Sequence, residues 1–100
     1  MSPHYAARVD TNHREIVDGL RRVGATVAST AALGKDRPDV LVGFRGRNYW
    51  LEIKNPARGR RDAEQHDDWH AAWNGQVAVV WTLWEALTVI GAVNAQERMR

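Results

Sequence analysis

Two strand-like runs joined by a short glycine-containing segment constrain the fold of this chain more than any other sequence feature. The run 39–44, Asp-Val-Leu-Val-Gly-Phe, is rich in β-branched residues, and the run 49–54, Tyr-Trp-Leu-Glu-Ile-Lys, follows the predicted turn 45–48. Strands joined by so few residues form an antiparallel hairpin. We therefore expect Asp39 and Glu52 to lie at the same open end of the ribbon, as near neighbours rather than direct partners.

The segments on both sides of the hairpin alternate between helical and strand patterns. In residues 12–23 the apolar side chains recur at helical spacing, Asn12 and Glu15 have the form of a capping box, and Gly24 supplies a stop. The remaining segments predict a short strand at 25–29, a helix at 62–74, a strand buried on both faces at 77–81, and a final helix that Thr82 and Glu85 cap and Gly91 closes.

The predicted order of elements is α-β-β-β-α-β-α. A helix between the third and fourth strands allows a parallel crossover, so we expect a mixed sheet of about four strands flanked by helices. The chain has 100 residues, the size of one small domain. We predict a single α/β domain over residues 1–100, with a core of about 11–91 and flexible ends.

Composition excludes several classes of protein. The chain has no cysteine, which leaves no disulfide framework and no thiolate metal site. No apolar run approaches the roughly 20 residues that span a bilayer, and residues 1–10 lack the apolar core of a signal peptide. We expect a soluble cytoplasmic protein that does not bind membranes.

Positive charge is concentrated in the middle of the chain, although the net charge is only +2. Eight basic residues and three acidic ones lie between positions 35 and 61. Such a stretch favours a surface that faces phosphate groups, although a solvated surface of mixed charge is the alternative. The basic residues that we expect to contact phosphate groups are Lys35, Arg37, Arg58, Arg60 and Arg61.

The hairpin also carries the residues suited to metal chemistry. Asp39 and Glu52 would repel each other at the end of the ribbon, and a hard divalent cation relieves that repulsion with the oxygen ligands it prefers. Lys54 lies two residues after Glu52, so both side chains point to the same face while Ile53 points into the core. An ammonium group there can position an attacking water and neutralise developing negative charge.

These residues resemble a known signature. Pro38-Asp39, a spacer of twelve residues and then Glu52-Ile53-Lys54 are similar to the PD-(D/E)xK nuclease superfamily, whose fold is restriction-endonuclease-like. The flanking segments resemble its VRR-Nuc branch: a first helix with an early acid (Glu15), a later helix with Gln65, and the strand run Gly-Gln-Val-Ala-Val-Val at 75–80. The likeness covers about residues 11–91.

The resemblance implies a magnesium- or manganese-dependent endonuclease that cleaves branched DNA such as a Holliday junction, acting as a homodimer in a bacterial cell or encoded by a phage. By position it makes Asp39, Glu52 and the Ile53 carbonyl metal ligands, with Lys54 as the catalytic lysine. It places Glu15 near the metal through water or a second ion, and Gln65 near the site.

Several alternatives stay open. Asp39 could simply start a strand, Glu52 and Lys54 could form an ion pair on an exposed sheet, and the capping box could explain Glu15 completely. A binding module for DNA junctions could keep the fold without catalysis. His66 and His70, four residues apart on a helix, have the spacing of a zinc hydrolase, but the acid after His66 is aspartate and no third ligand is evident.

The chain also contains five tryptophans. Core packing is the expectation for most of them, whereas an exposed tryptophan patch would favour a homodimer interface.

Overall fold

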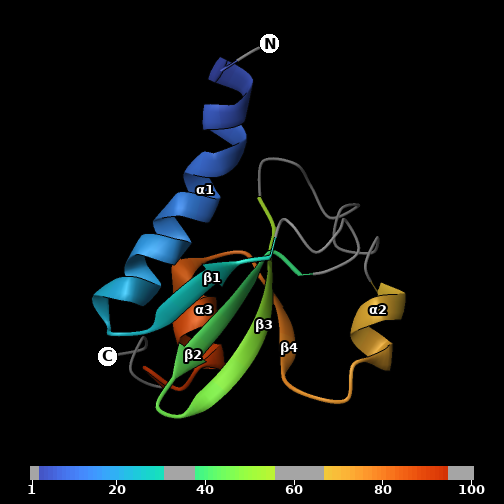
Figure 1. Ribbon diagram of the computed structural model, residues 1–100. Coiled ribbons are helices and arrows are strands. Elements are labelled where there is room, and N and C mark those ends of the chain that lie inside the picture. The colour runs from blue at the N-terminus through green and yellow to red at the C-terminus, as the bar shows by residue number, and fades with distance from the viewer. Residues whose placement is uncertain (1–2, 31–37, 56–66, 95–100) are drawn as a thin grey trace.

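The computed structural model describes residues 3–30, 38–55 and 67–94 (Figure 1), and its side chains are described for 11–30, 38–55 and 70–94. The elements follow the predicted order. They are α1 (Pro3–Arg22), β1 (Thr26–Ser29), β2 (Val40–Phe44), β3 (Arg47–Ile53), α2 (Asp67–Ala72), β4 (Val77–Val80) and α3 (Leu83–Val89).

The four strands form one mixed sheet in the order β1-β2-β3-β4. β1 pairs antiparallel with β2, and β2 pairs antiparallel with β3, which confirms the predicted hairpin. β3 and β4 run parallel, so the connection through α2 is the predicted crossover. The protein is a single α/β domain in which a mixed sheet is flanked by helices.

The hairpin turn is shorter than predicted, because Arg45 and Gly46 alone connect the strands and β3 already begins at Arg47. Both turn residues have positive φ, 53° and 81°, as the two central residues of a type I′ turn require. The predicted turn of residues 45–48 is therefore too long by two residues at its C-terminal end. Arginine is a rare choice for this backbone conformation, whereas Gly46 adopts it without steric conflict.

Helix α1 begins at Pro3, nine residues before the predicted start at Asn12. The predicted capping box of Asn12 and Glu15 is therefore wrong, because both residues lie inside the helix. The predicted stop is confirmed: Gly24 has φ +95°, and Gly24 N and Ala25 N donate to the carbonyls of Arg21 and Leu20. These two bonds are those of a Schellman motif.

Helix α3 begins as predicted at an N-cap threonine. Thr82 Oγ1 accepts a hydrogen bond from Glu85 N, and the Glu85 carboxylate accepts one from Trp81 N, one residue before the position a capping box uses. Gly91, with φ +80°, follows the helix as predicted. The two ends of α3 are thus set by local signals.

The core lies between the sheet and the pair of helices α1 and α3, which lie side by side in Figure 1. Ile16 and Leu20 of α1 and Leu51 of β3 are fully buried there. The two helices approach closely at Gly19, where an added Cβ would lie 2.4 Å from Leu83 Cδ2. Ile53 packs against this core, as predicted from strand alternation.

Two predictions about burial are wrong. Only Val80 of β4 is buried, because β4 is an edge strand of the described sheet and receives cover from one neighbour only. The tryptophans whose side chains are described are not core residues either: aliphatic side chains fill the core, Trp50, Trp81 and Trp84 are half-buried, and Trp73 is 42% exposed. Among the described helices, none is long and apolar enough to cross a membrane.

Candidate active site

The register of the hairpin brings Asp39 and Glu52 to directly opposite positions. The last pair of the ladder is Val40 with Leu51, so the next position along each strand holds Asp39 and Glu52. Each lies six residues from the two-residue turn, which corrects the prediction that they are near neighbours only. Opposite residues of an antiparallel pair project to the same face of the sheet. The two carboxylates therefore share one face at the open end of the ribbon.

Glu52 and Lys54 form a buried ion pair on β3 and just beyond its end. Lys54 Nζ lies 3.3 Å from Glu52 Oε2, and the two residues are 5% and 6% exposed. The alternative of a salt bridge on an exposed sheet does not describe this geometry. Buried ion pairs rarely stabilise a fold more than apolar side chains of similar size. The presence of a buried Glu52–Lys54 pair is therefore not explained by its contribution to the stability of the fold.

Asp39 contacts the backbone of the same segment. Its Oδ2 accepts a hydrogen bond of 2.7 Å from Ile53 N, the amide that lies between Glu52 and Lys54. Its own carbonyl accepts a hydrogen bond from Thr30 N, and the Thr30 hydroxyl contacts the Pro38 carbonyl. Asp39 is thus more than a strand-initiating residue, because its carboxylate is held against the Glu-x-Lys segment.

Asn12 fixes the other side of this segment. Its Nδ2 donates to the Lys54 carbonyl at 2.8 Å and to the Trp81 carbonyl at 3.3 Å. Lys54 N in turn donates to the Val80 carbonyl at 2.9 Å, so the ends of β3 and β4 are tied to each other and to α1. This role of Asn12 was not predicted from the sequence. The available signal was that Asn12 falls four residues before Ile16, on the apolar face of the helix.

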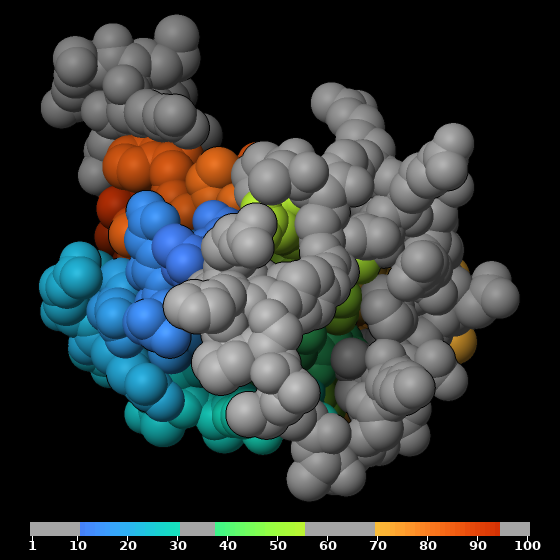
Figure 2. Space-filling model, turned by 90° about the horizontal axis from the view of Figure 1, so that it is seen from above, coloured from blue at the N-terminus to red at the C-terminus, as the bar shows by residue number. Residues whose placement is uncertain are grey.

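Figure 2 looks down on this end of the molecule. The yellow-green atoms from the end of β3 lie there beside the blue atoms of α1 and the orange atoms of α3. The three elements that carry Asn12, Lys54 and the residues after Trp81 therefore meet at one surface.

The remaining predicted residues are not joined to this cluster by the described contacts. Glu15 is exposed on α1, four residues before Gly19 and hence on the flank that faces α3. His70 is half-buried in α2. The other predicted site residues lie outside the described residues: Gln65, Lys35, Arg37, Arg58, Arg60, Arg61 and His66.

The donor set at the hairpin end fits a hard divalent cation. Beyond the contacts above, Asp39 still has Oδ1 and Glu52 has the buried Oε1, and the Ile53 carbonyl lies on the strand between Glu52 and Lys54. Mg²⁺ is commonly held by one or two carboxylates, with waters and substrate phosphate as its other ligands. Within the described ranges, no group of three or more His, Asp or Glu side chains could hold a metal ion.

No family model, curated protein or solved structure matches the chain. The function of the protein is therefore inferred from the geometry of the described residues and from the sequence motif that they carry.

Proposed function

We propose that this protein is a magnesium- or manganese-dependent endonuclease with a restriction-endonuclease-like fold, which hydrolyses phosphodiester bonds in DNA. The observation that carries the proposal is the contact of the Asp39 carboxylate with the Ile53 amide, directly beside the buried Glu52–Lys54 pair. Two carboxylates and a lysine thus meet on one short hairpin end. The resemblance of Pro38-Asp39 and Glu52-Ile53-Lys54 to the PD-(D/E)xK signature supports the same conclusion.

In this proposal Asp39, Glu52 and the Ile53 carbonyl hold the cation. When bound, it would lower the pKa of water and neutralise charge on the scissile phosphate. Lys54 places its ammonium group at the same face, where it orients the attacking water and stabilises the negative charge that develops on the phosphate oxygens. The ion pair with Glu52 fixes the ammonium group before substrate binds.

We further propose that the substrate is branched DNA and that a homodimer supplies two active sites. Trp73, whose ring contacts Trp50 at 5.6 Å between centroids, is the exposed aromatic side chain beside α2 that this homodimer would cover. Under this proposal two copies of the domain would cleave paired strands of a four-way junction. The basic residues expected to contact the DNA arms are Lys35, Arg37, Arg58, Arg60 and Arg61.

The test is cleavage of end-labelled four-way junction, flap and linear duplex DNA with Mg²⁺, with Mn²⁺ and with a chelator. The wild type is compared with Asp39→Asn and Lys54→Met, and with Arg47→Ala as a control at the exposed turn end of the hairpin. We expect metal-dependent cleavage that both site variants lose and Arg47→Ala retains. Circular dichroism and thermal unfolding check that each variant is folded.

Two outcomes would contradict the proposal. Equal cleavage by wild type, Asp39→Asn and Lys54→Met would remove the site assignment. Tight binding of junction DNA without cleavage in either metal would instead support a non-catalytic junction-binding module.

A further inference from the structure

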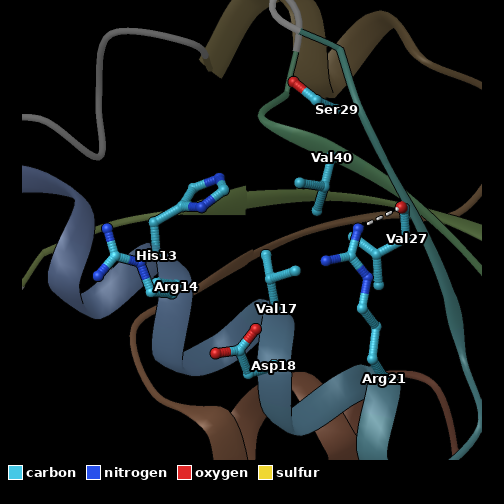
Figure 3. A pocket seen from close by; sticks show the side chains of 8 residues that line it. All are labelled: His13, Arg14, Val17, Asp18, Arg21, Val27, Ser29 and Val40. Carbon is cyan, nitrogen blue, oxygen red and sulfur yellow. Dashed lines mark hydrogen bonds between the residues drawn. The ribbon is translucent and has the colours of Figure 1, made fainter.

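A second feature of the described surface is an open pocket of about 360 Å³ between α1 and the strands β1 and β2. Its floor is apolar and consists of Val17, Val27 and Val40. Figure 3 shows that Arg21 projects from α1 toward Val27, and that Arg14 lies at the opposite end of the lining, beyond His13.

The charge of the pocket is positive. Two arginines, Arg14 and Arg21, line it against one acid, Asp18. Within the described part of the chain, Arg14 makes neither a hydrogen bond nor an ion pair, so its guanidinium donors remain available to a ligand.

Arg21 is held in place over the strand. Its Nη2 donates to the Val27 carbonyl at 3.0 Å (dashed in Figure 3). A guanidinium group has five N–H donors, so this single bond leaves others for a ligand. The bond also fixes the group at the pocket, which reduces the conformational entropy that binding would remove.

The strand positions that line the pocket adjoin those of the candidate active site. Ser29 and Val40, which both line the pocket, are register partners, and the next residues along the two strands are Thr30 and Asp39. Thr30 N donates to the Asp39 carbonyl. The Asp39 carboxylate projects to the opposite face of the sheet from Val40, so a polymer seated at it reaches the pocket by crossing the strand ends at Thr30 and Asp39.

We propose that this pocket binds a backbone phosphate of DNA on the β1 side of the cleaved bond. The inference builds on the proposed nuclease function and adds Arg14 and Arg21 to the DNA-binding surface. The guanidinium groups pair with phosphate oxygens through charge-assisted hydrogen bonds. The valine floor contacts the carbon atoms of the adjoining sugar. Asp18 lies four residues after Arg14 and three before Arg21, at spacings that place it beside both on the helix surface.

The test measures binding apart from cleavage. Fluorescence anisotropy of labelled duplex and four-way junction DNA is recorded with Ca²⁺ in place of Mg²⁺, at several salt concentrations, for wild type, Arg14→Ala and Arg22→Ala. Arg22 is the matched control, because it is an exposed arginine in the last turn of α1 that does not line the pocket.

We expect Arg14→Ala to weaken binding several-fold and to reduce the slope of log K against log salt by about 0.9, the change for one lost phosphate contact to duplex DNA. Arg22→Ala should leave both quantities unchanged. Equal affinity and salt slope in wild type and Arg14→Ala would overturn the inference, as would equal losses in Arg14→Ala and Arg22→Ala.

The binding experiment and the cleavage assay with Mg²⁺ and Mn²⁺ together separate this inference from the nuclease proposal. If the wild type cleaves DNA and Arg14→Ala binds DNA as well as the wild type, the proposed role of the pocket is wrong and the nuclease proposal stands. If binding depends on Arg14 but the protein cleaves no DNA, the role of the pocket stands and the nuclease proposal is wrong. Absence of DNA binding in the wild type would overturn both.

Discussion

The side-chain amide of Asn12 donates a 2.8 Å hydrogen bond to the backbone carbonyl of Lys54, a residue 42 positions later in the chain. A second bond from the same nitrogen reaches the Trp81 carbonyl. One polar side chain on the apolar face of α1 thus sets the positions of two strand ends. Lys54, the candidate catalytic lysine, lies at one of those ends. Asn12 of α1 holds its backbone carbonyl, and Glu52 holds its ammonium group.

Replacement of Asn12 should affect both stability and activity. Asn12→Leu leaves the carbonyls of Lys54 and Trp81 without their donor, and an unsatisfied buried polar group costs about 1–3 kcal/mol. We expect urea unfolding to show a loss of that size. We also expect kcat for DNA cleavage to fall more than KM rises, because Lys54 is displaced. Asn48→Ala, an exposed asparagine near the hairpin turn, should change neither, and equal effects of the two substitutions would contradict a positioning role for Asn12.

The losses of stability on removing the charge of Glu52 and the charge of Lys54 should be strongly coupled. Glu52→Gln leaves the Lys54 ammonium buried without its counter-charge, and Lys54→Met leaves the carboxylate in the same state. We expect each single substitution to destabilise the fold by about 3 kcal/mol. The double variant Glu52→Gln/Lys54→Met should lose clearly less than the sum of the two. Chemical unfolding of all four proteins in a double-mutant cycle measures the coupling, and additive losses would show that the pair does not interact.

Two substitutions at Asp39 separate structure from chemistry. Asp39→Asn keeps an oxygen that accepts from Ile53 N but removes the charge, whereas Asp39→Ala removes both. We expect Asp39→Asn to unfold near the wild-type midpoint, and Asp39→Ala to lose about 1 kcal/mol or more. Neither should cleave DNA with Mg²⁺ or Mn²⁺. Retained cleavage by Asp39→Asn would mean that the carboxylate charge is not needed for catalysis.

Gly46 should be sensitive to substitution for reasons of backbone conformation alone. Its φ is +81°, and no atom lies within 4 Å of an added Cβ. Gly46→Ala should therefore destabilise the hairpin by about 1–2 kcal/mol, measured as a shift in thermal unfolding. Gly43, which lies within β2 and has no positive φ, is the comparison, and an Ala substitution there should not carry this conformational cost.

Local patterns in the sequence were sufficient to predict the element order and the antiparallel hairpin. The stops at Gly24 and Gly91 and the threonine cap of α3 were also predicted, because each depends on neighbouring residues. Asn12 shows why other features were not predictable. Its sequence context, with Glu15 three residues later, is that of a helix start, but its partners lie on β3 and after β4. Such contacts exist only once the strands are assembled.

Burial was the other quantity that the sequence did not reveal. Alternation along β3 placed Glu52 and Lys54 on one face, yet it could not distinguish a solvated face from a covered one. For the tryptophans the burial was overestimated. Their hydrophobicity favoured the core, but the aliphatic residues of α1, α3 and the sheet fill it. The exact register also depended on the turn, where the positive φ of Arg45 could not be read from its residue type.

The length of the hairpin allows a fluorescent label to be placed far from the candidate site. The turn lies six residues from the candidate site along each strand, or roughly 20 Å at the rise of an extended chain. Because the chain contains no cysteine, Arg47→Cys would create a unique thiol at an exposed position beside the turn. A fluorophore attached there would be connected to Asp39 and Glu52 through two paired strands, at the opposite end of the hairpin from both carboxylates. Energy transfer from that dye to a labelled DNA arm would measure the orientation of the substrate on the protein.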